Sequence, residues 1–523
     1  MKLIDLLTEE NAYEISGSQD AEITGIVSST ADVIPGCCFV CIKGFSVDGH
    51  TFAGKAVEGG AAAVVMQDRD LFERFCDENS EAVREGRLSA VFSRKGTRHA
   101  LGMLSDRFWG HPSGRLRLVG VTGTKGKTTT SIMLKSILDR QGEKTGLVGT
   151  MYNMIGERVI PTERTTPEAN VLEPLLAEMA DEGVASCVME VSSQGLKLER
   201  VGGCEYELGI FTNLSRDHIG TTEHPDMEDY ADSKAKLFGM AKAGLLNRDS
   251  EWYPRIKASA KCRLYTFSAK EPCTEEPCAK DAGEPCPEGP ENPEGPADFR
   301  ARNIVYRKDG VDFDLTGLCP TMHISTRIPG QFSIYNAMAA ASAAYLLGCG
   351  EDAIVGALAD VVVKGKAEVV PTGTDFTVMI DYAHNPDSFI NILGAVKPFA
   401  KRTVFLFGAG GDRNRPRELM GETAANNADL TIITSDNPRT EDPARIVADI
   451  EKGALRTGKP YVCIVDRREA IWYSILNARP GDVIILAGKG HETEQIFKDR
   501  TVHFDEREVV AEAMAEYRRR HGL

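Results

Sequence analysis

The chain has 523 residues, of which 42% are hydrophobic, and its formal net charge is −16 at pH 7. This length allows about three domains, and the acidic balance argues against binding to nucleic acid, which favours basic surfaces. The amino terminus has no secretion-signal pattern, and no apolar run is long enough to cross a membrane. We therefore expect a cytoplasmic protein that acts on small molecules.

The first predicted unit spans residues 1–105 and alternates short strands, turns and one helix pattern. Pro35-Gly36 marks a turn before a strand predicted over residues 38–42. The cysteines of this stretch, Cys37, Cys38 and Cys41, are predicted to be buried small side chains and not metal ligands. The pattern indicates a small α/β domain whose loops could bind a ligand.

A glycine-rich segment, LVGVTGTKGKTTT, occupies residues 118–130. It joins a strand predicted over residues 116–121 to a helix that begins near Lys127. Unpaired N–H groups and the dipole at a helix N-terminus attract phosphate, Lys127 can reach the β- and γ-oxygens, and Thr128 can offer a hydroxyl to Mg²⁺. Val121 replaces the first glycine of the strict phosphate-loop pattern, which leaves the shorter TGTKGKTT form. The segment predicts a nucleoside triphosphate site.

Three further apolar strands are predicted after this loop, over residues 144–149, 186–191 and 207–212, and a helix is predicted over 170–183. Glu190 lies near the end of the second of these strands, where a carboxylate could hold Mg²⁺ directly or through water. Asn213, Asp217 and His218 follow the third strand. A solvated loop glutamate and a surface histidine are the alternatives.

A helix is predicted over residues 226–240, and its apolar stripe carries one lysine, Lys234, whereas Lys236 lies on another face. The residues of this stripe are Met227, Tyr230, Lys234, Leu237 and Phe238. A buried lysine needs an anion or a chemical modification, unless its stem extends to solvent.

Residues 268–298 are rich in proline, glycine and acidic residues, which predicts a disordered surface insertion. Three Glu-Pro-Cys repeats end at Cys273, Cys278 and Cys286, but their spacing matches no zinc pattern.

A helix predicted over residues 332–347 belongs to the second unit, which spans 106–361, and the third unit spans 362–523. Five strands are predicted in the third unit, over residues 377–380, 404–407, 430–434, 461–465 and 483–486. Helix patterns separate most of them, as in a doubly wound, mostly parallel sheet. The loops DYAHNPDS, GAGGDRNRPR, SDNPRTEDP and AGKGHETEQ follow these strands, where such sheets bind ligands.

The motifs GVTGTKGKTTT, EVSSQGL, FTNLSRDH, DYAHNPDS, GGDRNRPR, DNPR and AGKGHE occur in this order, together with the Lys234 helix. In this set the chain resembles the Mur ligase family, in its MurE branch, over all residues except 268–298. The resemblance implies an α/β fold of three domains, with a P-loop-type central domain and a Rossmann-like C-terminal domain. Residues 1–105 would bind the UDP end of the substrate, 106–361 ATP, and 362–523 the amino acid.

The resemblance also implies the reaction, which is ATP-dependent addition of meso-diaminopimelate to UDP-N-acetylmuramoyl-L-alanyl-D-glutamate through an acyl phosphate, in peptidoglycan precursor synthesis. ATP and Mg²⁺ would be the cofactors, and we expect a monomer with no nucleic-acid or membrane partner. The alternatives are the same chemistry with L-lysine or another diamino acid, an altered acceptor, or a catalytically silent nucleotide-binding homologue. A folylpolyglutamate-type ligase would leave DNPR and GKGHE unexplained.

Residue roles follow from the same resemblance. The implied catalytic residues are Lys127, Glu190, His218 and Lys234. The implied metal ligands are Thr128, Glu190, His218 and Lys234 as a carbamate. The implied ATP contacts are Gly123, Thr124, Lys125, Gly126, Lys127, Thr128, Thr129, Asn336 and Arg413. The implied UDP-substrate contacts are Ser29, Thr165, Thr166, Ser192 and Arg200. The implied amino-acid contacts are Arg413, Asp436, Asn437, Pro438, Arg439, Gly488 and Glu492.

Physical chemistry agrees with two of these roles. CO₂ reacts with a neutral amine, so burial that lowers the pKa of Lys234 would favour the carbamate. A distal carboxylate on the incoming amino acid suits the guanidinium of Arg439, and lysine has no such carboxylate. A surface salt bridge is the alternative for Arg439.

Four departures from the family pattern stand out. Gln194 replaces a histidine after EVSS, Ser29-Thr30-Ala31 replaces Asp-Ser-Arg, Lys366 replaces an arginine, and DHIGTTEHP replaces DHLDYHG. By the same resemblance, the first two lie in regions that handle the UDP-linked acceptor, so they bear on the identity of the acceptor.

Overall fold

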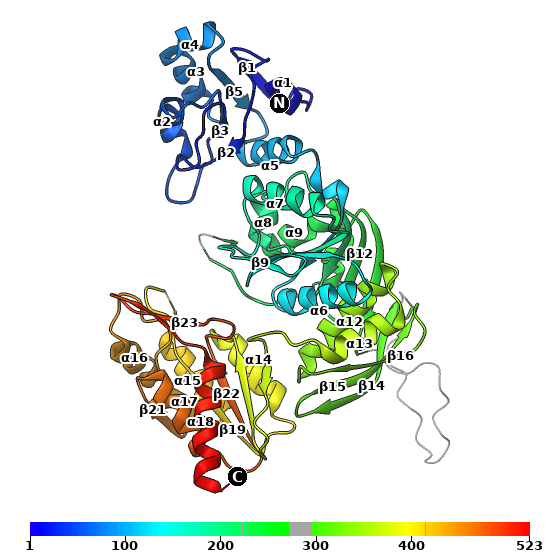
Figure 1. Ribbon diagram of the computed structural model, residues 1–523, viewed down its shortest axis with the longest axis vertical. Coiled ribbons are helices and arrows are strands. Elements are labelled where there is room, and N and C mark those ends of the chain that lie inside the picture. The colour runs from blue at the N-terminus through cyan, green and yellow to red at the C-terminus, as the bar shows by residue number, and fades with distance from the viewer. Residues whose placement is uncertain (221–222, 271–294, 414, 523) are drawn as a thin grey trace. The chain divides into compact units, whose positions relative to one another are not determined.

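The computed structural model describes residues 1–220, 223–270, 295–413 and 415–522. They form two compact units, here called the first unit (Met1–Asp298 with Ala339–Gly350) and the second unit (Phe299–Met338 with Glu351–Leu523). Figure 1 labels the elements of both. Among the described residues, no helix is long and apolar enough to span a membrane.

The amino-terminal part of the first unit is built on a five-stranded sheet of order β1-β5-β4-β3-β2, in which only β1 is antiparallel to its neighbour. Its strands are β1 (Tyr13–Ser16), β2 (Ile26–Val27), β3 (Cys38–Val40), β4 (Ala63–Met66) and β5 (Ser89–Ser93). Its helices are α1 (Leu3–Leu6), η1 (Gly49–Phe52), α2 (Ala53–Glu58), α3 (Arg69–Glu78), α4 (Ser80–Arg84) and α5 (Thr97–Phe108). Cys37, Cys38 and Cys41 are fully buried in its two cores, which confirms their predicted burial.

The remainder of the first unit holds strands in the order β13-β12-β11-β6-β10-β7-β8-β9, parallel from β13 to β7. These strands are β6 (Arg117–Thr122), β7 (Thr145–Val148), β8 (Asn153–Ile155), β9 (Arg158–Ile160), β10 (Ser186–Glu190), β11 (Tyr206–Phe211), β12 (Ala241–Asn247) and β13 (Arg263–Ser268). The helices are η2 (Pro112–Arg115), α6 (Lys127–Arg140), α7 (Ala169–Asp181), α8 (Ser193–Lys197), α9 (Met227–Ala235), α10 (Leu237–Met240) and α11 (Tyr253–Ser259). Because β10, β6 and β11 are parallel neighbours, their carboxyl ends meet at one edge.

These elements confirm the strands and helices predicted between residues 116 and 212 to within two residues at each end. The single helix predicted over 226–240 is wrong in one respect, because it divides at Lys236 into α9 and α10. Of the predicted insertion over 268–298, residues 271–294, with Cys273, Cys278 and Cys286, lie outside the described residues. Its disorder therefore stays a prediction.

The second unit contains an antiparallel meander and a six-stranded sheet of order β17-β18-β22-β19-β20-β21. The meander strands are β14 (Phe299–Arg307), β15 (Gly310–Gly317) and β16 (Met322–Thr326). The sheet strands are β17 (Glu368–Val370), β18 (Thr377–Asp381), β19 (Arg402–Phe407), β20 (Leu430–Ile433), β21 (Tyr461–Cys463) and β22 (Asp482–Ala487), and a hairpin is formed by β23 (Glu494–Ile496) and β24 (Thr501–His503). The helices are α13 (Glu351–Asp360), α14 (Pro386–Val396), α15 (Arg417–Asn427), α16 (Pro443–Arg456), α17 (Arg467–Leu476) and α18 (Glu506–His521), and α12 (Gln331–Leu346) has residues in both units.

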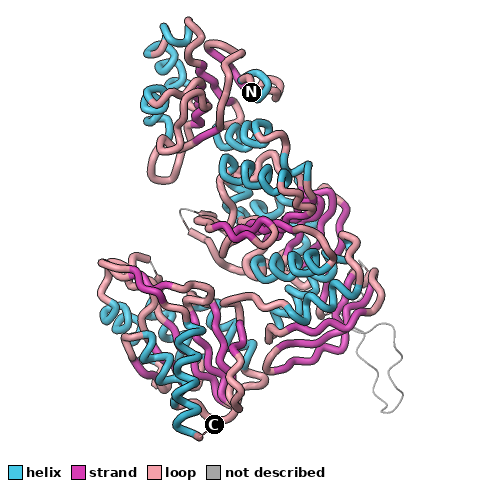
Figure 2. The backbone as a smooth tube through the Cα atoms, in the orientation of Figure 1, coloured by secondary structure: helices cyan, strands magenta, loops and turns pink. Residues whose placement is uncertain are grey.

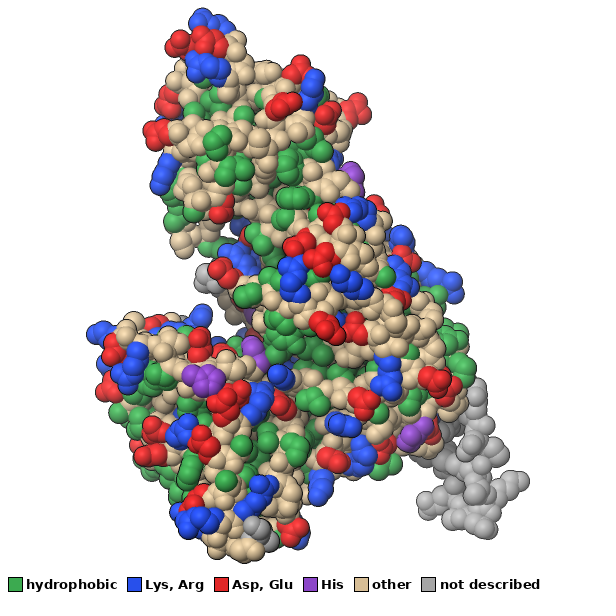
Figure 3. All heavy atoms as spheres, viewed as in Figure 1, with side chains coloured by type: hydrophobic (Ala, Val, Ile, Leu, Met, Phe, Trp, Pro, Cys, Tyr) green, Lys and Arg blue, Asp and Glu red, His purple; other side chains and the backbone are tan. Residues whose placement is uncertain are grey.

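Helices cover both faces of this six-stranded sheet, and in Figure 2 cyan helices lie on either side of its magenta strands. One face packs against α17 and α18 through residues such as Ile471 and Val510. On the other face, Phe389 of α14 lies 4.9 Å from the ring of Phe405 and 4.8 Å from that of Phe407. Strands β18 to β21 are parallel, which confirms the predicted doubly wound, Rossmann-like arrangement. On the face shown in Figure 3, acidic and basic side chains are interspersed.

Two glycines allow α15 and α16 to pack with their backbones in contact. A Cβ on Gly453 would lie 1.8 Å from the backbone oxygen of Glu418, and one on Gly421 would lie 2.1 Å from that of Ile450. We expect Gly453→Ala to destabilise the second unit by about 2–3 kcal/mol, because the helices must move apart. The measurement is urea unfolding followed by circular dichroism.

The matched control is Gly394→Ala in α14, where a Cβ would meet no atom within 4 Å. Alanine there should stabilise the unit by roughly 0.5–1 kcal/mol through helix propensity. Equal effects of the two substitutions would contradict the packing argument.

Candidate active site

The phosphate loop connects β6 to α6 and depends on two glycines. Gly123 has φ +153° and Gly126, which precedes α6, has φ +87°. A Cβ on Gly123 would lie 2.0 Å from Oγ1 of Thr212. Other residues would therefore be strained at position 126 and sterically excluded at 123. The loop brings the N-terminus of α6 to the carboxyl edge of the sheet, as the sequence predicts for a phosphate site.

Asn213, which follows β11, holds this loop in place. Its Oδ1 accepts from the backbone N–H of Lys125 at 3.0 Å, and its Nδ2 donates to the oxygen of Lys125 at 2.9 Å. The backbone N–H of Thr124 donates to the oxygen of Asn213 at 2.9 Å. The sequence places Asn213 at this edge of the sheet, but its role as a brace for the phosphate loop comes from the structure.

Two lysines converge on the loop. Nζ of Lys127 and Nζ of Lys234 each donate to the backbone oxygen of Gly123 at 2.9 Å. Lys234 is 1% exposed and lies 4.5 Å from the ring centre of Tyr230. The alternative in which its stem extends to solvent is therefore wrong.

The surroundings of Lys234 favour its neutral form. Burial, and secondarily the charge of Lys127, hold the pKa of Lys234 well below its ordinary value, although Asp217 acts in the opposite direction. A neutral primary amine at this position is a nucleophile towards CO₂ and is also easier to accommodate in an apolar stripe.

Glu190, at the end of β10, is buried with 1% exposure, so the alternative of a solvated loop glutamate is wrong. Its carboxylate accepts from Oγ1 of Thr128 at 2.9 Å and from Oγ1 of Thr150 at 2.8 Å. The backbone N–H of Thr150 also donates to it at 2.9 Å. No sequence motif predicts this role for Thr150, and only its position after β7 could have suggested it. The hydroxyl of Thr128 and the carboxylate of Glu190 are hard oxygen donors of the kind that Mg²⁺ prefers.

His218 lies outside this buried group. Its side chain is 46% exposed, its φ is +58°, and its Nδ1 lies 2.7 Å from Oε2 of Glu223. Its ring is 5.9 Å from that of Tyr230, whose hydroxyl is 3.2 Å from Oγ1 of Thr124. In the described part of the chain, no three His, Cys, Asp or Glu side chains form a metal-binding group. A metal-ligand role for His218 stays a prediction.

Four of the residues implied to hold the UDP-linked acceptor lie close together. Oγ1 of Thr166 accepts from the N–H of Ser192 at 3.0 Å, and Arg200 donates to the oxygen of Thr166 at 3.2 Å. Thr165 is joined to Thr150 by a 3.0 Å hydroxyl contact. Ser29 lies in the loop after β2, where its hydroxyl accepts from the N–H of Ala31 at 3.2 Å.

Two of the departures from the family pattern are in contact. Nε2 of Gln194 donates to Oε1 of Glu223 at 3.2 Å, and Glu223 lies within the altered DHIGTTEHP segment. Both residues line a cavity of about 520 Å³. The full lining is Phe45, Gln194, Lys197, Leu198, Gly220, Glu223 and Pro225.

In the second unit, the DNPR and GKGHE loops meet. Nδ2 of Asn437 donates to Oε2 of Glu492 at 2.8 Å, and Nζ of the fully buried Lys489 donates to Oδ1 of Asn437 at 2.9 Å. A Cβ on Gly488, whose φ is +113°, would lie 2.5 Å from Oδ2 of Asp436. Five of the residues implied for amino-acid binding are thus assembled here: Asp436, Asn437, Pro438, Gly488 and Glu492.

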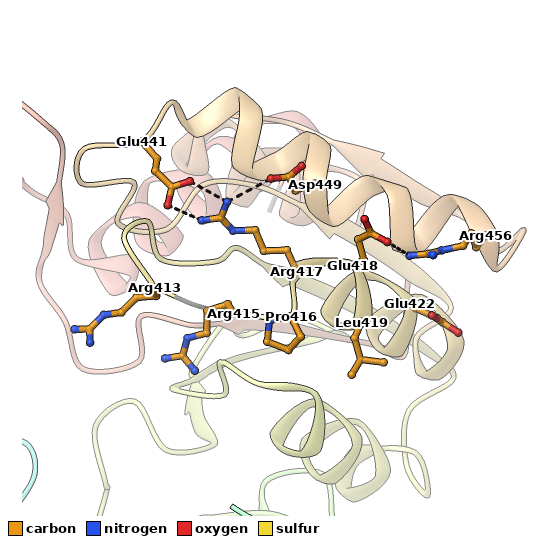
Figure 4. A pocket seen from close by; sticks show the side chains of 10 residues that line it. All are labelled: Arg413, Arg415, Pro416, Arg417, Glu418, Leu419, Glu422, Glu441, Asp449 and Arg456. Carbon is orange, nitrogen blue, oxygen red and sulfur yellow. Dashed lines mark hydrogen bonds and ion pairs between the residues drawn. The ribbon is translucent and has the colours of Figure 1, made fainter. Parts of the chain in front are cut away.

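The two arginines of the implied amino-acid set are presented by adjacent loops. Arg439 has φ +52° and donates from Nη1 to the oxygen of Gly411 at 3.1 Å. Arg413 is exposed and lines a cavity of about 760 Å³ together with Arg415. In Figure 4, Arg413 and Arg415 project away from Arg417, which is bound by Glu441 and Asp449. The cavity therefore carries two arginines that are separate from its internal ion pairs.

The DYAH loop packs against the GKGHE loop through rings. The ring of Tyr382 lies 4.9 Å from that of His384 and 5.0 Å from that of His491, and Nζ of Lys366 lies 4.7 Å from the Tyr382 ring. Burial lowers the pKa of His491 to about 4, with a smaller contribution from Lys366. Asn336, implied to contact ATP, is a buried residue of α12 in the second unit.

The fold and these residue sets define a nucleotide-binding enzyme with a second, Rossmann-like substrate unit. Three family models match the chain: "Mur ligase family, catalytic domain" over residues 22–109, "Mur ligase middle domain" over 121–344, and "Mur ligase, glutamate ligase domain" over 365–490.

Curated relatives match over the whole chain. The UDP-N-acetylmuramoyl-L-alanyl-D-glutamate–2,6-diaminopimelate ligase of Caldanaerobacter subterraneus is 43% identical over 99% of both chains. That of Geobacillus thermodenitrificans is 39% identical over 99% of this chain and all of its own. A solved structure of a ligase with the same name has a TM-score of 0.66 at 27% identity and covers 99% of each chain. MurF of Thermotoga maritima with ADP, at 16% identity and TM-score 0.56, shares the fold.

The chain therefore belongs to the Mur ligase family, as the sequence motifs indicate, and within it to the MurE branch. It is an ATP-dependent ligase, and the family uses ATP and Mg²⁺.

Glu190→Gln should weaken Mg²⁺-dependent nucleotide binding at least tenfold. The amide keeps the side-chain volume and one acceptor oxygen but loses the charge next to Thr128. Isothermal titration with ADP, with and without Mg²⁺, measures the effect. The control is Glu178→Gln, an exposed residue of α7 that pairs with Arg158. Unchanged Mg²⁺ dependence in Glu190→Gln would contradict the proposed donor pair.

Proposed function

We propose that this ligase joins meso-diaminopimelate to UDP-N-acetylmuramoyl-L-alanyl-D-glutamate in peptidoglycan precursor synthesis. The proposal rests mainly on the hydrogen bonds that Asn437 of the DNPR loop forms with Lys489 and Glu492 of the GKGHE loop. Full-length similarity to ligases named for these two substrates supports it.

The reaction has two steps. A carboxylate oxygen of the D-glutamyl residue attacks the γ-phosphorus of ATP, and the bond from that phosphorus to ADP breaks. The amine of the diamino acid then attacks the acyl carbon, loses a proton, and the carbon–oxygen bond to phosphate breaks. Activation is needed because a free carboxylate is a poor acyl donor, and binding of all three reactants by one enzyme makes each encounter effectively unimolecular.

The residues of the phosphate loop bind and orient ATP. The N–H groups at the start of α6 and the ammonium of Lys127 would contact the phosphates, and Thr128 and Glu190 would hold Mg²⁺. When bound, Mg²⁺ neutralises negative charge on the phosphates. Lys127 now donates to Gly123 and Thr124 within its own loop, so it must exchange these carbonyls for phosphate oxygens.

We propose that Lys234 is used as its carbamate. Its position in an apolar stripe, its lowered pKa and its proximity to the phosphate loop support this assignment. Carbamate formation joins the nitrogen of the neutral amine to the carbon of CO₂ and releases one proton from that nitrogen, which converts a neutral group beside Lys127 into an anion. An anion at this position could serve as a metal ligand beside Glu190 and, as proposed, His218.

For the diamino acid, we propose that Arg439 and Arg413 receive carboxylates, and that Asp436 and Glu492 receive ammonium groups. Lysine has no distal carboxylate, so the lysine alternative leaves one arginine unused. The alternative of a silent homologue is not favoured, because Lys127, Glu190, His218 and Lys234 are all present. The three-domain boundaries, the cytoplasmic location and the monomeric state stay predictions.

The first test is phosphate release with ATP, UDP-muramoyl dipeptide and either meso-diaminopimelate or L-lysine. We expect at least 100-fold higher kcat/KM for meso-diaminopimelate, because a bidentate guanidinium–carboxylate contact is lost with lysine. Arg439→Met should remove most of this preference, and Arg445→Met, in α16, is a control on a neighbouring surface. Equal turnover of the two amino acids by the unmodified enzyme would overturn the assignment.

The second test concerns Lys234. Lys234→Ala should lower kcat at least 1,000-fold, and short carboxylates such as acetate should restore part of it, because they can replace the carbamate oxygens. Lys236→Ala is the control, since that neighbour is exposed at the α9–α10 boundary. Full activity of Lys234→Ala without added carboxylate would exclude the carbamate.

A further inference from the structure

Arg467, the first residue of α17, is buried beneath the two loops of the amino-acid site, with 1% exposure. Its Nη1 donates to the backbone oxygen of Ser435 at 3.2 Å, and its Nη2 donates to that of Ala487 at 2.8 Å. Ser435 immediately precedes Asp436, and Ala487 immediately precedes Gly488. One guanidinium group thus joins the starting points of both loops.

Glu506, the first residue of α18, holds this guanidinium. Its Oε1 accepts from Nε of Arg467 at 2.9 Å and from Nη2 at 2.7 Å, and both side chains are fully buried. Burial raises the pKa of Glu506, while the charge of Arg467 opposes that rise. A buried ion pair gains little net stability over apolar residues of similar size. Its presence at this point is better explained by the backbone geometry that it imposes.

The two loops have little freedom relative to each other. Gly488 lies so close to Asp436 that a Cβ would come within 2.5 Å of Oδ2. Nε2 of Gln495 donates to the backbone oxygen of Asp436 at 2.7 Å, and Lys489 reaches Asn437 from the other loop. A displacement of either loop start would therefore move several of the charged and polar groups expected to contact the amino acid.

We propose that Arg467, held by Glu506, is a positioning residue that fixes residues 435–439 to residues 487–492 and thereby sets the affinity for the diamino acid. The inference rests on the proposed function for the role of these loops. Arg467 acts through the backbone of Ser435 and Ala487, because its own side chain is covered.

The test compares Arg467→Met/Glu506→Gln, which removes the clamp without leaving a buried charge unpaired, with Arg467→Lys, which keeps the charge but loses the planar fork. We expect the KM for meso-diaminopimelate to rise at least tenfold in the double variant and about threefold in Arg467→Lys. The kcat and the KM for ATP should stay within twofold, because the phosphate loop belongs to the other unit and the implied ATP contacts of this unit, Asn336 and Arg413, lie outside residues 435–439 and 487–492.

A matched control is available in the same sheet. Arg402 and Asp482 form an ion pair at the first residues of β19 and β22, at the opposite end of the strands from the substrate loops. Arg402→Met/Asp482→Asn should leave the KM for meso-diaminopimelate within twofold of the parent value. An unchanged KM in the double variant at Arg467, or an equal rise in this control, would overturn the proposal.

Hydrogen–deuterium exchange separates the clamp from the proposed function. The backbone amides of residues 435–437, 439 and 488–492 should exchange at least fivefold faster in the Arg467 variants than in the parent and the control, with α14 unchanged. If the parent enzyme does not use meso-diaminopimelate, the proposed function fails, and the exchange data still decide whether the clamp exists. If the double variant does not fold, the KM for meso-diaminopimelate and the exchange rates are compared between Arg467→Lys and the parent, and unchanged values would overturn the proposal.

Discussion

The arrangement at the phosphate loop depends on the backbone oxygen of Gly123, which accepts from both Lys127 and Lys234. Because each Nζ is 2.9 Å from the same atom, the two amines lie less than about 6 Å apart. Two full charges at that separation repel by about 3 kcal/mol at an effective dielectric constant near 20. The low pKa of Lys234 relieves this repulsion, and a bound polyphosphate would relieve it further. The site is therefore built for an anion, and the Gly123 oxygen is the atom that joins the two lysines.

In the second unit, too, buried cationic side chains donate hydrogen bonds to oxygen atoms near the substrate loops. There, cationic groups are buried under the loops and satisfied by backbone or side-chain oxygens: Lys489 by Asn437 and Glu492, and Arg467 by Ser435 and Ala487. Burying charge in this way is costly unless every donor is used. These buried cations lie near the carboxyl ends of parallel strands, where the loops expected to bind substrates follow the strands in both units.

The sequence predicts well what is encoded locally. The strand, glycine turn and helix around residues 116–140 follow from periodicity and from residues that only a phosphate loop requires. Five of the six strands of the C-terminal sheet follow from their apolar runs, whereas the short edge strand β17 is not predicted. Contacts between distant segments could not be predicted in this way. Thr150 reaches Glu190 across 40 positions, and Arg467 reaches Glu506 across 39. Neither partner carries a local pattern, since a threonine after a strand and an arginine at a helix start are ordinary residues.

Two of the departures from the family pattern, Gln194 and the DHIGTTEHP segment, form one structural feature. Along the chain, Gln194 and the DHIGTTEHP segment are two separate departures, and only the first lies in a region implied to handle the acceptor. In the folded chain they are one feature, because the amide of Gln194 donates to Glu223 and the carboxylate of Glu223 also meets Nδ1 of His218. A histidine that ligates a metal commonly gives its other ring nitrogen to a carboxylate. Gln194 and Glu223 thus contact a candidate metal ligand indirectly and directly, respectively, and they also line the cavity of about 520 Å³.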